Sequence, residues 1–355
     1  MMYPSGLDIH ICKEAEIEKL MGFINKYWSK NHILSSSKVL MDWQHYNKKD
    51  RCYNFVVALN KNDPELIGIL GFIPSRHFDP ALSENNTVWL VTWKIREDSK
   101  IAGLGLLLHG FLVTNENHKA MGTIGNNNKV AGLYKALGYE IGQLNQFYII
   151  NDKKENFCLV DSYPKNPYRP QHFNHNSKKK FIKIDKLNFA ELSRKLTYQQ
   201  SEAELPKKSF RYFYKRYLEH PIYNYDLYAI AEGEQYIGLV VMRCVEYKDN
   251  YALRIVDYFG PDDGIARMRS QFQELLRVYD AEYIDIFNYG INDTFFEGSG
   301  FIKLNTGSKV IIPNYYEPFE KRNVKINFAF HADEKFSYKL FKGDADQDRP
   351  NLMSH

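Results

Sequence analysis

Apolar residues along the first 150 positions alternate in some stretches and recur at helical spacing in others, which predicts a regular series of strands and helices. Turn-forming residues at 60–64 separate two strand-like runs, as in a hairpin. The predicted elements are, in order, strand 7–12, helices 13–27 and 37–45, strands 54–59, 66–72 and 87–95, helix 103–113, strand 120–124, helix 129–137 and strand 139–150. This order favours an α/β domain with a mixed sheet and helices on both of its faces.

The second half of the chain repeats this order of elements. Phe296 follows Tyr134 by 162 positions, and Gly300 follows Gly138 by the same distance, each pair at the end of a predicted helix. The predicted elements are strand 181–184, helix 187–196, a hairpin of 226–231 and 236–245, strand 251–258, helix 264–279, strand 282–287, a short helix to 297 and a strand from 301. A repeat of a whole domain is therefore expected.

The repeat divides the chain into four predicted parts. Residues 1–150 form the first domain, and 178–320 form the second. Between them, 151–177 is rich in Lys, Asn, Pro and Tyr and is interpreted as a connector, and 321–355 is a C-terminal extension. His172 and His175 in the connector have neither a helix nor a third ligand to support them, so we expect no metal site there.

Composition excludes several classes of protein. The 47 basic and 43 acidic residues give a net charge of +4, which offers no case for nucleic-acid binding. The four cysteines are widely spaced, so neither a disulfide framework nor a zinc site is indicated. No run of 18 apolar residues and no leader pattern occurs, so we expect no membrane span and a cytoplasmic location.

The loop that precedes helix 103–113 has the pattern of an anion site. It contains two glycines, Gly103 and Gly105, after a strand and before an apolar helix. Successive backbone N–H groups at such a turn, followed by a helix N-terminus, bind phosphate, and glycine allows the phosphate to approach closely. The pattern alone is common, because many helices begin with glycines.

A second motif makes the loop more specific. Asn127, Val130, Tyr134, Gly138 and Tyr139 follow the spacing Asn-x-x-Ala-x-x-x-Tyr-x-x-x-Gly-Phe, with mild changes. Together with the loop, this motif resembles the GNAT acyltransferase superfamily over residues 5 to 150, although Lys100 replaces the usual Arg or Gln. The two halves then resemble a tandem arrangement of GNAT domains, each with a mixed, largely antiparallel sheet.

The resemblance implies an acyl-coenzyme A donor, such as acetyl-coenzyme A, and a set of residues that bind it. Ile95 falls where the bulged strand of that superfamily offers backbone hydrogen bonds to the pantetheine arm and to the oxyanion. The donor-binding residues implied are Ile95, Lys100, Ile101, Ala102, Gly103, Leu104, Gly105, Leu106, Asn127 and Tyr134. No metal is implied.

Tyr134 is the candidate catalytic residue. Attack of an amine on a thioester expels a thiolate, and a phenol beside the sulfur can protonate it. The alternative is an ordinary helix tyrosine packed in the core, since the chain has 26 tyrosines. The general base stays open: the strand 88–95 has no carboxylate, Glu97 and Asp98 beyond it suit turn capping, and a base from the second half is an alternative.

The second half has lost the donor-binding features. Its loop after Tyr258 has no Gly-x-Gly and carries Asp262 and Asp263 where a diphosphate would lie, and Phe296 has no hydroxyl. Division of labour between repeats is also known in the Fem-type aminoacyltransferases and N-myristoyltransferase. We therefore expect one donor site in the chain, with the second half shaping an acceptor site or covering the first.

Four polar residues are candidates for acceptor binding: Asp257, Asn288, Asp344 and Asp346. Asp257 has a structural hydrogen-bonding role as its alternative. The two aspartates at 344 and 346 belong to the C-terminal tail, which begins at Lys342 and in which carboxylates alternate. A frayed, solvated terminus is the alternative interpretation of this tail.

These features predict an acyl-coenzyme A-dependent N-acyltransferase that acts on a small-molecule amine. By analogy alone, the acceptor class we expect is an amino sugar or a nucleotide sugar of surface polysaccharide synthesis. Two alternatives stay open: a Fem-like transferase that uses aminoacyl-tRNA, which the intact loop argues against, and a non-catalytic acyl-coenzyme A sensor or scaffold.

Overall fold

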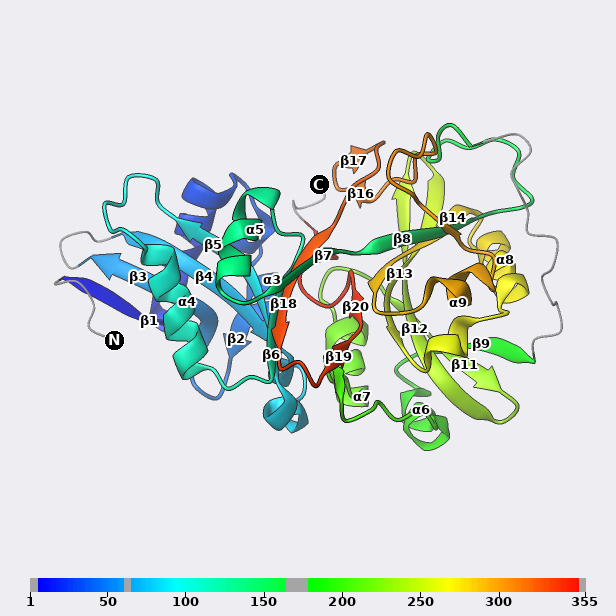
Figure 1. The fold of residues 1–355 in the computed structure, drawn as a ribbon, viewed down its shortest axis with the longest axis horizontal. Coiled ribbons are helices and arrows are strands. Elements are labelled where there is room, and N and C mark those ends of the chain that lie inside the picture. Colours follow the sequence, from blue (N-terminus) through cyan, green and yellow to red (C-terminus); the bar gives the residue numbers. More distant parts are fainter. Residues whose placement is uncertain (1–5, 61–64, 164–177, 351–355) are drawn as a thin grey trace.

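Two eight-stranded sheets lie side by side along the long axis of the molecule (Figure 1). The structure is a computed structural model, and it describes residues 6–60, 65–163 and 178–350. Helices flank both sheets, so the predicted α/β class and the arrangement in two halves, each with a mixed and largely antiparallel sheet, are confirmed. Most of the predicted connector, with His172 and His175, lies outside the described residues.

The first sheet has the strand order β1-β3-β4-β5-β6-β18-β7, with β2 beside β3. Its neighbours are antiparallel except for β5 and β6, which run parallel. The bounds are β1 (Leu7–Lys13), β2 (Tyr46–Asn47), β3 (Cys52–Asn60), β4 (Leu66–Pro74), β5 (Thr87–Ile95), β6 (Ala120–Ile124), β7 (Glu140–Gln143) and β18 (Asn327–Ala332). β5 and β6 have the predicted limits.

Helices cover both faces of the first sheet. One face packs against α1 (Ile17–Phe23), α2 (Ile33–Ser36) and α3 (Lys38–His45). The other packs against α4 (Leu104–Asn115) and α5 (Ala131–Ala136). Short 3-10 or π turns cover 14–16, 24–28, 75–77, 80–85 and 128–130. The helix predicted over 13–27 is therefore divided into three consecutive segments, which are a 3-10 turn, the α-helix α1 and a π turn.

The second sheet repeats this plan in the order β15-β8-β14-β13-β12-β11-β9, with β20 beside β14. Its parallel pair is β13 with β14. The strands are β8 (Asn145–Ile150), β9 (Lys179–Ile184), β11 (Asp226–Glu232), β12 (Gln235–Tyr247), β13 (Asn250–Phe259), β14 (Ala281–Tyr289), β15 (Ile302–Lys303) and β20 (Leu340–Phe341).

The remaining elements of the second half cover this sheet and its edges. One face of the sheet packs against α8 (Arg269–Val278) and α9 (Asp293–Glu297). The core shared with the first half includes residues of α6 (Phe189–Lys195) and α7 (Phe210–Phe213). Two small ribbons pair β10 (Glu204–Leu205) with β19 (Ser337–Tyr338) and β16 (Tyr315–Tyr316) with β17 (Phe319–Glu320), and turns cover 214–218 and 262–265.

The two halves exchange strands. The segment predicted as one strand over 139–150 is two strands, and β7 stays in the first sheet while β8 crosses into the second, beside β14 (Figure 1). In return, β18 from the C-terminal extension inserts between β6 and β7. Apolar alternation fixes which face of a strand is buried but not which neighbour it pairs with, so the exchange has no local signature.

The two strands of each parallel pair diverge at one end and leave a gap in the sheet, which we call a notch. Only the notch of the second sheet is filled by a strand. β5 and β6 pair from Thr87 to Trp89 and then diverge. β13 and β14 pair as far as Ile255 and then diverge too, but β20 enters this second gap and pairs with β14. The N–H of Gly343 next donates to the carbonyl of Val256 on β13, at 2.7 Å. The tail of the chain therefore occupies the second notch.

Buried cations fix the described part of this tail, residues 342–350, between the halves, so that part is not a frayed terminus. Arg216 donates to the carbonyls of Gly343, Asp344 and Ala345. The Nζ of Lys208 lies 2.5 Å from Asp257 and 2.7 Å from Asp344, and all three side chains are buried. Because these ions are buried away from water, loss of one partner would leave the other as an uncompensated buried charge. The ion pairs therefore stabilise the position of the tail.

Candidate functional site

The open notch between β5 and β6 contains a cavity of about 620 Å³. Its walls come from β5, the start of α4, the loop after β6, α5 and the tail. The lining is apolar along β5 and α5, where Val91, Trp93, Ile95, Val130 and Leu133 contribute, and polar where β6 ends. A cavity of this size and lining suits a ligand with a long, mostly apolar arm.

A β-bulge lies on the cavity side of β5. Leu70 of β4 pairs with Trp93 and Phe72 pairs with Leu90, so β5 has one residue more than β4 between these pairs, at Val91 and Thr92. A bulge leaves a backbone group without a strand partner. The hydroxyl of Thr92 is also buried and lacks a partner among the described residues. These groups can bind an amide-bearing ligand.

The expected position of the bulge is therefore corrected. Ile95 pairs regularly with Gly68 and contributes its side chain to the cavity wall, but it does not lie in the bulge. A bulge bends its strand, and β5 bends where it leaves its parallel neighbour β6. The last β5–β6 pair is at Trp89, so the bulge follows directly after it. The backbone groups of the bulge are therefore at Val91 and Thr92, three to four residues before the predicted position, Ile95.

The glycine loop begins α4 as predicted. Gly103 has a φ of +71°, which a residue with a side chain adopts at a cost, and it lies at the N-cap of the helix. The N–H groups of the first helical turn point out of that end, where the helix dipole favours an anion. Gly105 lines the cavity against Trp93, so the N-terminus of α4 opens onto the notch.

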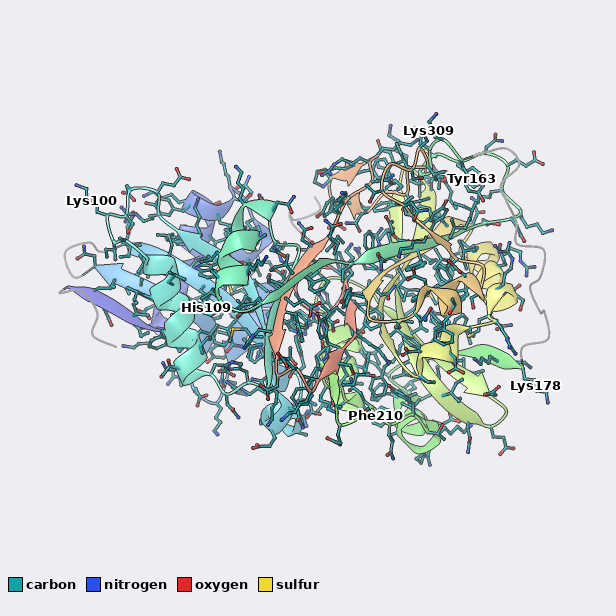
Figure 2. The ribbon with its side chains drawn as sticks, viewed as in Figure 1. Lys100, His109, Tyr163, Lys178, Phe210 and Lys309 are labelled. Atoms are coloured by element: carbon teal, nitrogen blue, oxygen red, sulfur yellow. The ribbon has the colours of Figure 1, made fainter. Side chains whose placement is uncertain are left out.

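The other predicted loop residues take different positions. Ile101 and Leu104 pack into the core on that face of the sheet. Lys100 is exposed and projects from the outer end of the first half, away from the cavity wall (Figure 2). Ala102 and Leu106 are also exposed. Of the ten predicted donor residues, the cavity lining contains Ile95, Gly105, Asn127 and Tyr134.

Tyr134 lies on α5 at the cavity wall. It is 4% exposed, hydrogen-bonds to Thr123, and meets Trp93 edge to face with 6.0 Å between ring centres. Burial raises the pKa of Tyr134 to about 12. The phenol is therefore protonated at neutral pH and is available as a proton donor.

A buried pair lies behind Tyr134 and sets its surroundings. His109 Nε2 and the Tyr139 hydroxyl are 2.9 Å apart, and the His109 ring stacks on Trp93. Burial lowers the pKa of His109 to about 4, so this imidazole is neutral at physiological pH. Neither His109 nor Tyr139 lines the cavity, and their contacts hold the rings around Tyr134 in place.

The end of β6 adds polar groups that the sequence did not single out. Asn126 lines the cavity, and both its amide oxygen and nitrogen are buried without a partner in the described part of the chain. Asn127, which was predicted, caps the turn before α5 through the N–H of Lys129 at 3.0 Å. The run of three asparagines directly after a buried strand is the signal that could have identified Asn126.

The C-terminal tail closes one end of the cavity with Asp346, Gln347 and Arg349. The carboxylate of Asp346 accepts a hydrogen bond from Nε of Arg349 at 2.9 Å. Asp346 is therefore the one predicted acceptor residue that lines this cavity. Gln347 and Arg349 were missed because the tail reaches the site only through contacts distant in sequence.

The other three predicted acceptor residues are interior groups. Asp257 and Asp344 share the ammonium of Lys208, and Asp257 also accepts from the Tyr217 hydroxyl at 2.7 Å. Asn288 is buried where β14 pairs with β20. All three lie near the second notch that the tail fills, and none of them lines the cavity of the open notch.

A second cavity, of about 190 Å³, lies on the other side of the tail. Its walls come from β12, the segment around β16, and the tail, including Arg243, Asn314 and Lys342. Asp346, Gln347 and Arg349 line both cavities. The two spaces therefore share a wall made of residues 346–349 of the tail, with an apolar space on one side and a polar space on the other.

The carboxylates considered near the loop lie elsewhere. Glu97 pairs with Lys94 and Asp98 with Arg96, and both acids are exposed. In the second half, Asp262 pairs with Lys339 of the C-terminal extension at 2.6 Å. Within residues 6–60, 65–163 and 178–350, no group of three or more metal-ligating side chains occurs, and no helix is long and apolar enough to span a membrane.

The halves together define a tandem protein with an open notch in one sheet and a filled notch in the other. The same fold occurs in the crystal structure of a GCN5-related N-acetyltransferase from Kribbella flavida, which is 10% identical, with a TM-score of 0.54 over 91% of this chain and 70% of that one. A GCN5-related N-acetyltransferase from Anabaena variabilis is 12% identical, with a TM-score of 0.53 over 91% and 72%. The chain has the fold of this superfamily.

No protein-family model matches the sequence, and comparison with curated protein sequences finds no match either. At 10% and 12% sequence identity, the likeness to these solved structures shows the fold alone.

Proposed function

We propose that this protein is an acyl-coenzyme A-dependent N-acyltransferase with one donor site, in the open notch of the first half. The observation that carries the proposal is the cavity itself, which brings together the bulge of β5, the N-terminus of α4 and the hydroxyl of Tyr134. Helix and loop N–H groups suit a diphosphate, the bulge suits the pantetheine amides, and the apolar wall suits the acyl arm.

The chemistry we propose is direct transfer. The amine of the acceptor loses a proton to Asp346 and attacks the thioester carbonyl, which forms a C–N bond and a tetrahedral oxyanion. Backbone N–H groups at Val91 and Thr92 stabilise that oxyanion. The C–S bond then breaks, its electron pair leaves with the sulfur, and Tyr134 protonates the thiolate. The nitrogen of the new C–N bond loses its remaining extra proton, which restores the Tyr134 phenol, and Asp346 releases its own proton to solvent. The Nε hydrogen bond of Arg349 holds the Asp346 carboxylate in place at the cavity wall.

The two halves have different roles in this proposal. The first half binds acetyl-coenzyme A or another acyl-coenzyme A, and the second half contributes the acceptor space on the far side of the tail. The acceptor is a small polar amine, and an amino sugar or a nucleotide sugar of surface polysaccharide synthesis is the class we propose. Tyrosine rings at 223, 315 and 316 in that space suit packing against a sugar ring.

The test is donor binding followed by turnover. The purified full chain should bind acetyl-coenzyme A in calorimetry and should release free thiol when a panel of amines, including glucosamine, is added. Thiol release with no acceptor dependence would contradict the transferase. Tight binding without turnover on any amine would favour the sensor or scaffold, and transfer from aminoacyl-tRNA with no coenzyme A binding would favour the Fem-like alternative.

A further inference from the structure

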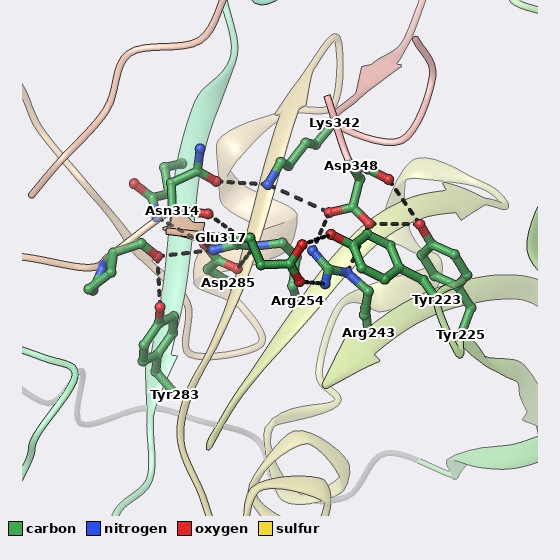
Figure 3. A network of polar contacts seen from close by, with 12 residues as sticks. Tyr223, Tyr225, Arg243, Arg254, Tyr283, Asp285, Asn314, Glu317, Lys342 and Asp348 are labelled. Carbon is green, nitrogen blue, oxygen red and sulfur yellow. Dashed lines mark hydrogen bonds and ion pairs between the residues drawn. The ribbon is translucent and has the colours of Figure 1, made fainter. Parts of the chain in front are cut away.

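The smaller cavity presents several hydrogen-bond donors on one side (Figure 3). Arg243 directs Nε and Nη2 to Asp348, at 3.1 and 3.0 Å, so that Nη1 has no closer carboxylate than Glu317, at 4.0 Å. Lys342 donates to Oδ1 of Asn314 at 3.0 Å. The Nδ2 of Asn314 is buried without a partner among the described residues. This wall therefore has N–H groups left to donate.

Three cations and three carboxylates line the smaller cavity, but they are separated: Glu317 and Glu320 are partly exposed and Asp346 pairs with Arg349, while Arg243 and Lys342 lie on the opposite, buried side. Arg243 and Lys342 share the single buried carboxylate of Asp348, which lies 3.6 Å from Nζ of Lys342. Burial and then the nearby Arg254 guanidinium lower the pKa of Lys342 to about 7. Arg254 has its own partner, Asp285, and Glu317 is 36% exposed at the rim. An anion in the cavity would stabilise the ammonium form of Lys342.

Both observations point to a ligand with an oxyanion. We propose that the smaller cavity anchors the acceptor by a carboxylate or a phosphate bound to Arg243, Asn314 and Lys342. This inference rests on the proposed function, because it treats the ligand as the acceptor amine. The cavity of about 190 Å³ holds roughly six water volumes, so the bound part is as small as one sugar or amino acid.

The shared wall explains how such an anchor serves transfer. Asp346, Gln347 and Arg349 line both cavities, so an acceptor held by its anion at Lys342 directs its other end toward the tail. An amine at that end meets Asp346, the one carboxylate common to both spaces. The anion therefore orients the acceptor across the wall toward the donor thioester.

The experiment compares three matched amines: glucosamine, glucosamine 6-phosphate and 2-amino-2-deoxyglucuronate, which carry a hydroxyl, a phosphate and a carboxylate at the end of the sugar opposite the amine. Calorimetry on the full chain measures their binding without any need for turnover. At least one of the two anionic ligands should bind tenfold or more tightly than glucosamine, and the stronger of the two identifies the anion. Equal binding of all three, or preference for glucosamine, would overturn the proposal.

Variants test whether the named residues cause the preference. Lys342→Met should reduce it to less than threefold, and Asn314→Asp, which adds a carboxylate beside Lys342, should reverse it. Lys339→Met is the matched control, since Lys339 is also a paired lysine of the C-terminal extension but lies outside the cavity wall. A preference that survives in Lys342→Met, with folding confirmed by circular dichroism, would also overturn the proposal. Anion-selective binding without acyl transfer would contradict the proposed function alone.

Discussion

The side-chain amide of Gln347 packs directly onto Gly125, so that the tail and the end of β6 meet with no room for a side chain between them. Gly125 also has a φ of +85°, a conformation that glycine adopts without strain. Through this contact, a residue of the C-terminal tail forms part of a cavity that otherwise belongs to the first half.

Replacement of Gly125 by alanine should move Gln347 and open the shared wall. We expect a loss of about 1–2 kcal/mol in the free energy of unfolding from the positive φ, together with a KM for donor or acceptor raised severalfold. Gly307→Ala is the control, since Gly307 has a φ of +83° and no neighbour within 4 Å of a built Cβ. Equal kinetic effects in the two variants would show that the Gln347 contact has no part in the site.

Tyr134→Phe should lower kcat by about 100-fold or more, because proton transfer by a positioned side chain contributes on the order of 10²–10⁴. The Kd for acetyl-coenzyme A, measured by calorimetry, should change little. Tyr139→Phe removes a neighbouring hydroxyl that is bonded to His109 outside the cavity wall, and should change kcat only a few fold. If Tyr134→Phe retains full turnover, the hydroxyl does not protonate the leaving thiolate.

Asp346→Asn should reduce kcat and leave donor binding intact, since the amide cannot accept the proton of the acceptor ammonium. The loss should shrink as pH rises and more of the free amine is already deprotonated, so the pH dependence separates a base from a structural residue. Asp346→Glu should restore part of the rate. A pH-independent loss that Asp346→Glu fails to restore would assign Asp346 to structure.

Removal of the ammonium of Lys208 should destabilise the whole chain. Lys208→Met leaves Asp257 and Asp344 buried without their cation, and an uncompensated buried charge costs about 3–5 kcal/mol. The penalty should fall at lower pH, where a carboxyl group can take up a proton. Denaturant titrations at pH 7 and pH 5 measure both effects, and a triple variant with Asp257→Asn and Asp344→Asn should recover stability. A penalty below about 1 kcal/mol would mean that the tail is held by other contacts.

The fully buried imidazole of His45 should make stability fall in acid. Burial lowers the pKa of His45 to about 3, below its ordinary value of 6.5. The unfolded chain therefore binds a proton at His45 between pH 6.5 and 3, and the folded chain does not. Below pH 6.5, wild type should lose about 1.4 kcal/mol per pH unit relative to His45→Gln. A constant difference in unfolding free energy from pH 7.5 to 5 would contradict this linkage.

Most of the fold could be predicted from the sequence, because it depends on local patterns. Apolar alternation located β5 and β6, and the glycine loop located the start of α4. Partner choice could not be predicted, since the face that Phe147 or Phe328 buries is the same whichever strand lies beside it. The strand exchange was therefore missed, as was the small ribbon of β16 and β17.

The candidate site also has one part that local sequence patterns predict and another part that they do not. Tyr134 and Gly105 lie on elements whose motif fixes their spacing, and both line the cavity of the open notch. Arg243, Asn314 and Lys342 come from three separate parts of the chain, and no pattern in the sequence brings them together. Asp257 was selected as a polar residue at a strand end and Asp344 as one of the alternating carboxylates of the tail, but their shared partner Lys208 lies at least 49 positions away from either.

Because β8 and β18 are exchanged between the two sheets, the first sheet is completed only after the C-terminal extension has been synthesised. When residue 150 has left the ribosome, the first sheet still lacks the strand that belongs beside β6, and that strand is made about 177 residues later, roughly 10–35 s at ordinary elongation rates. Until then β6 has an unpaired edge, which other chains can pair with. A nascent or truncated chain that ends before Asn327 is therefore expected to aggregate.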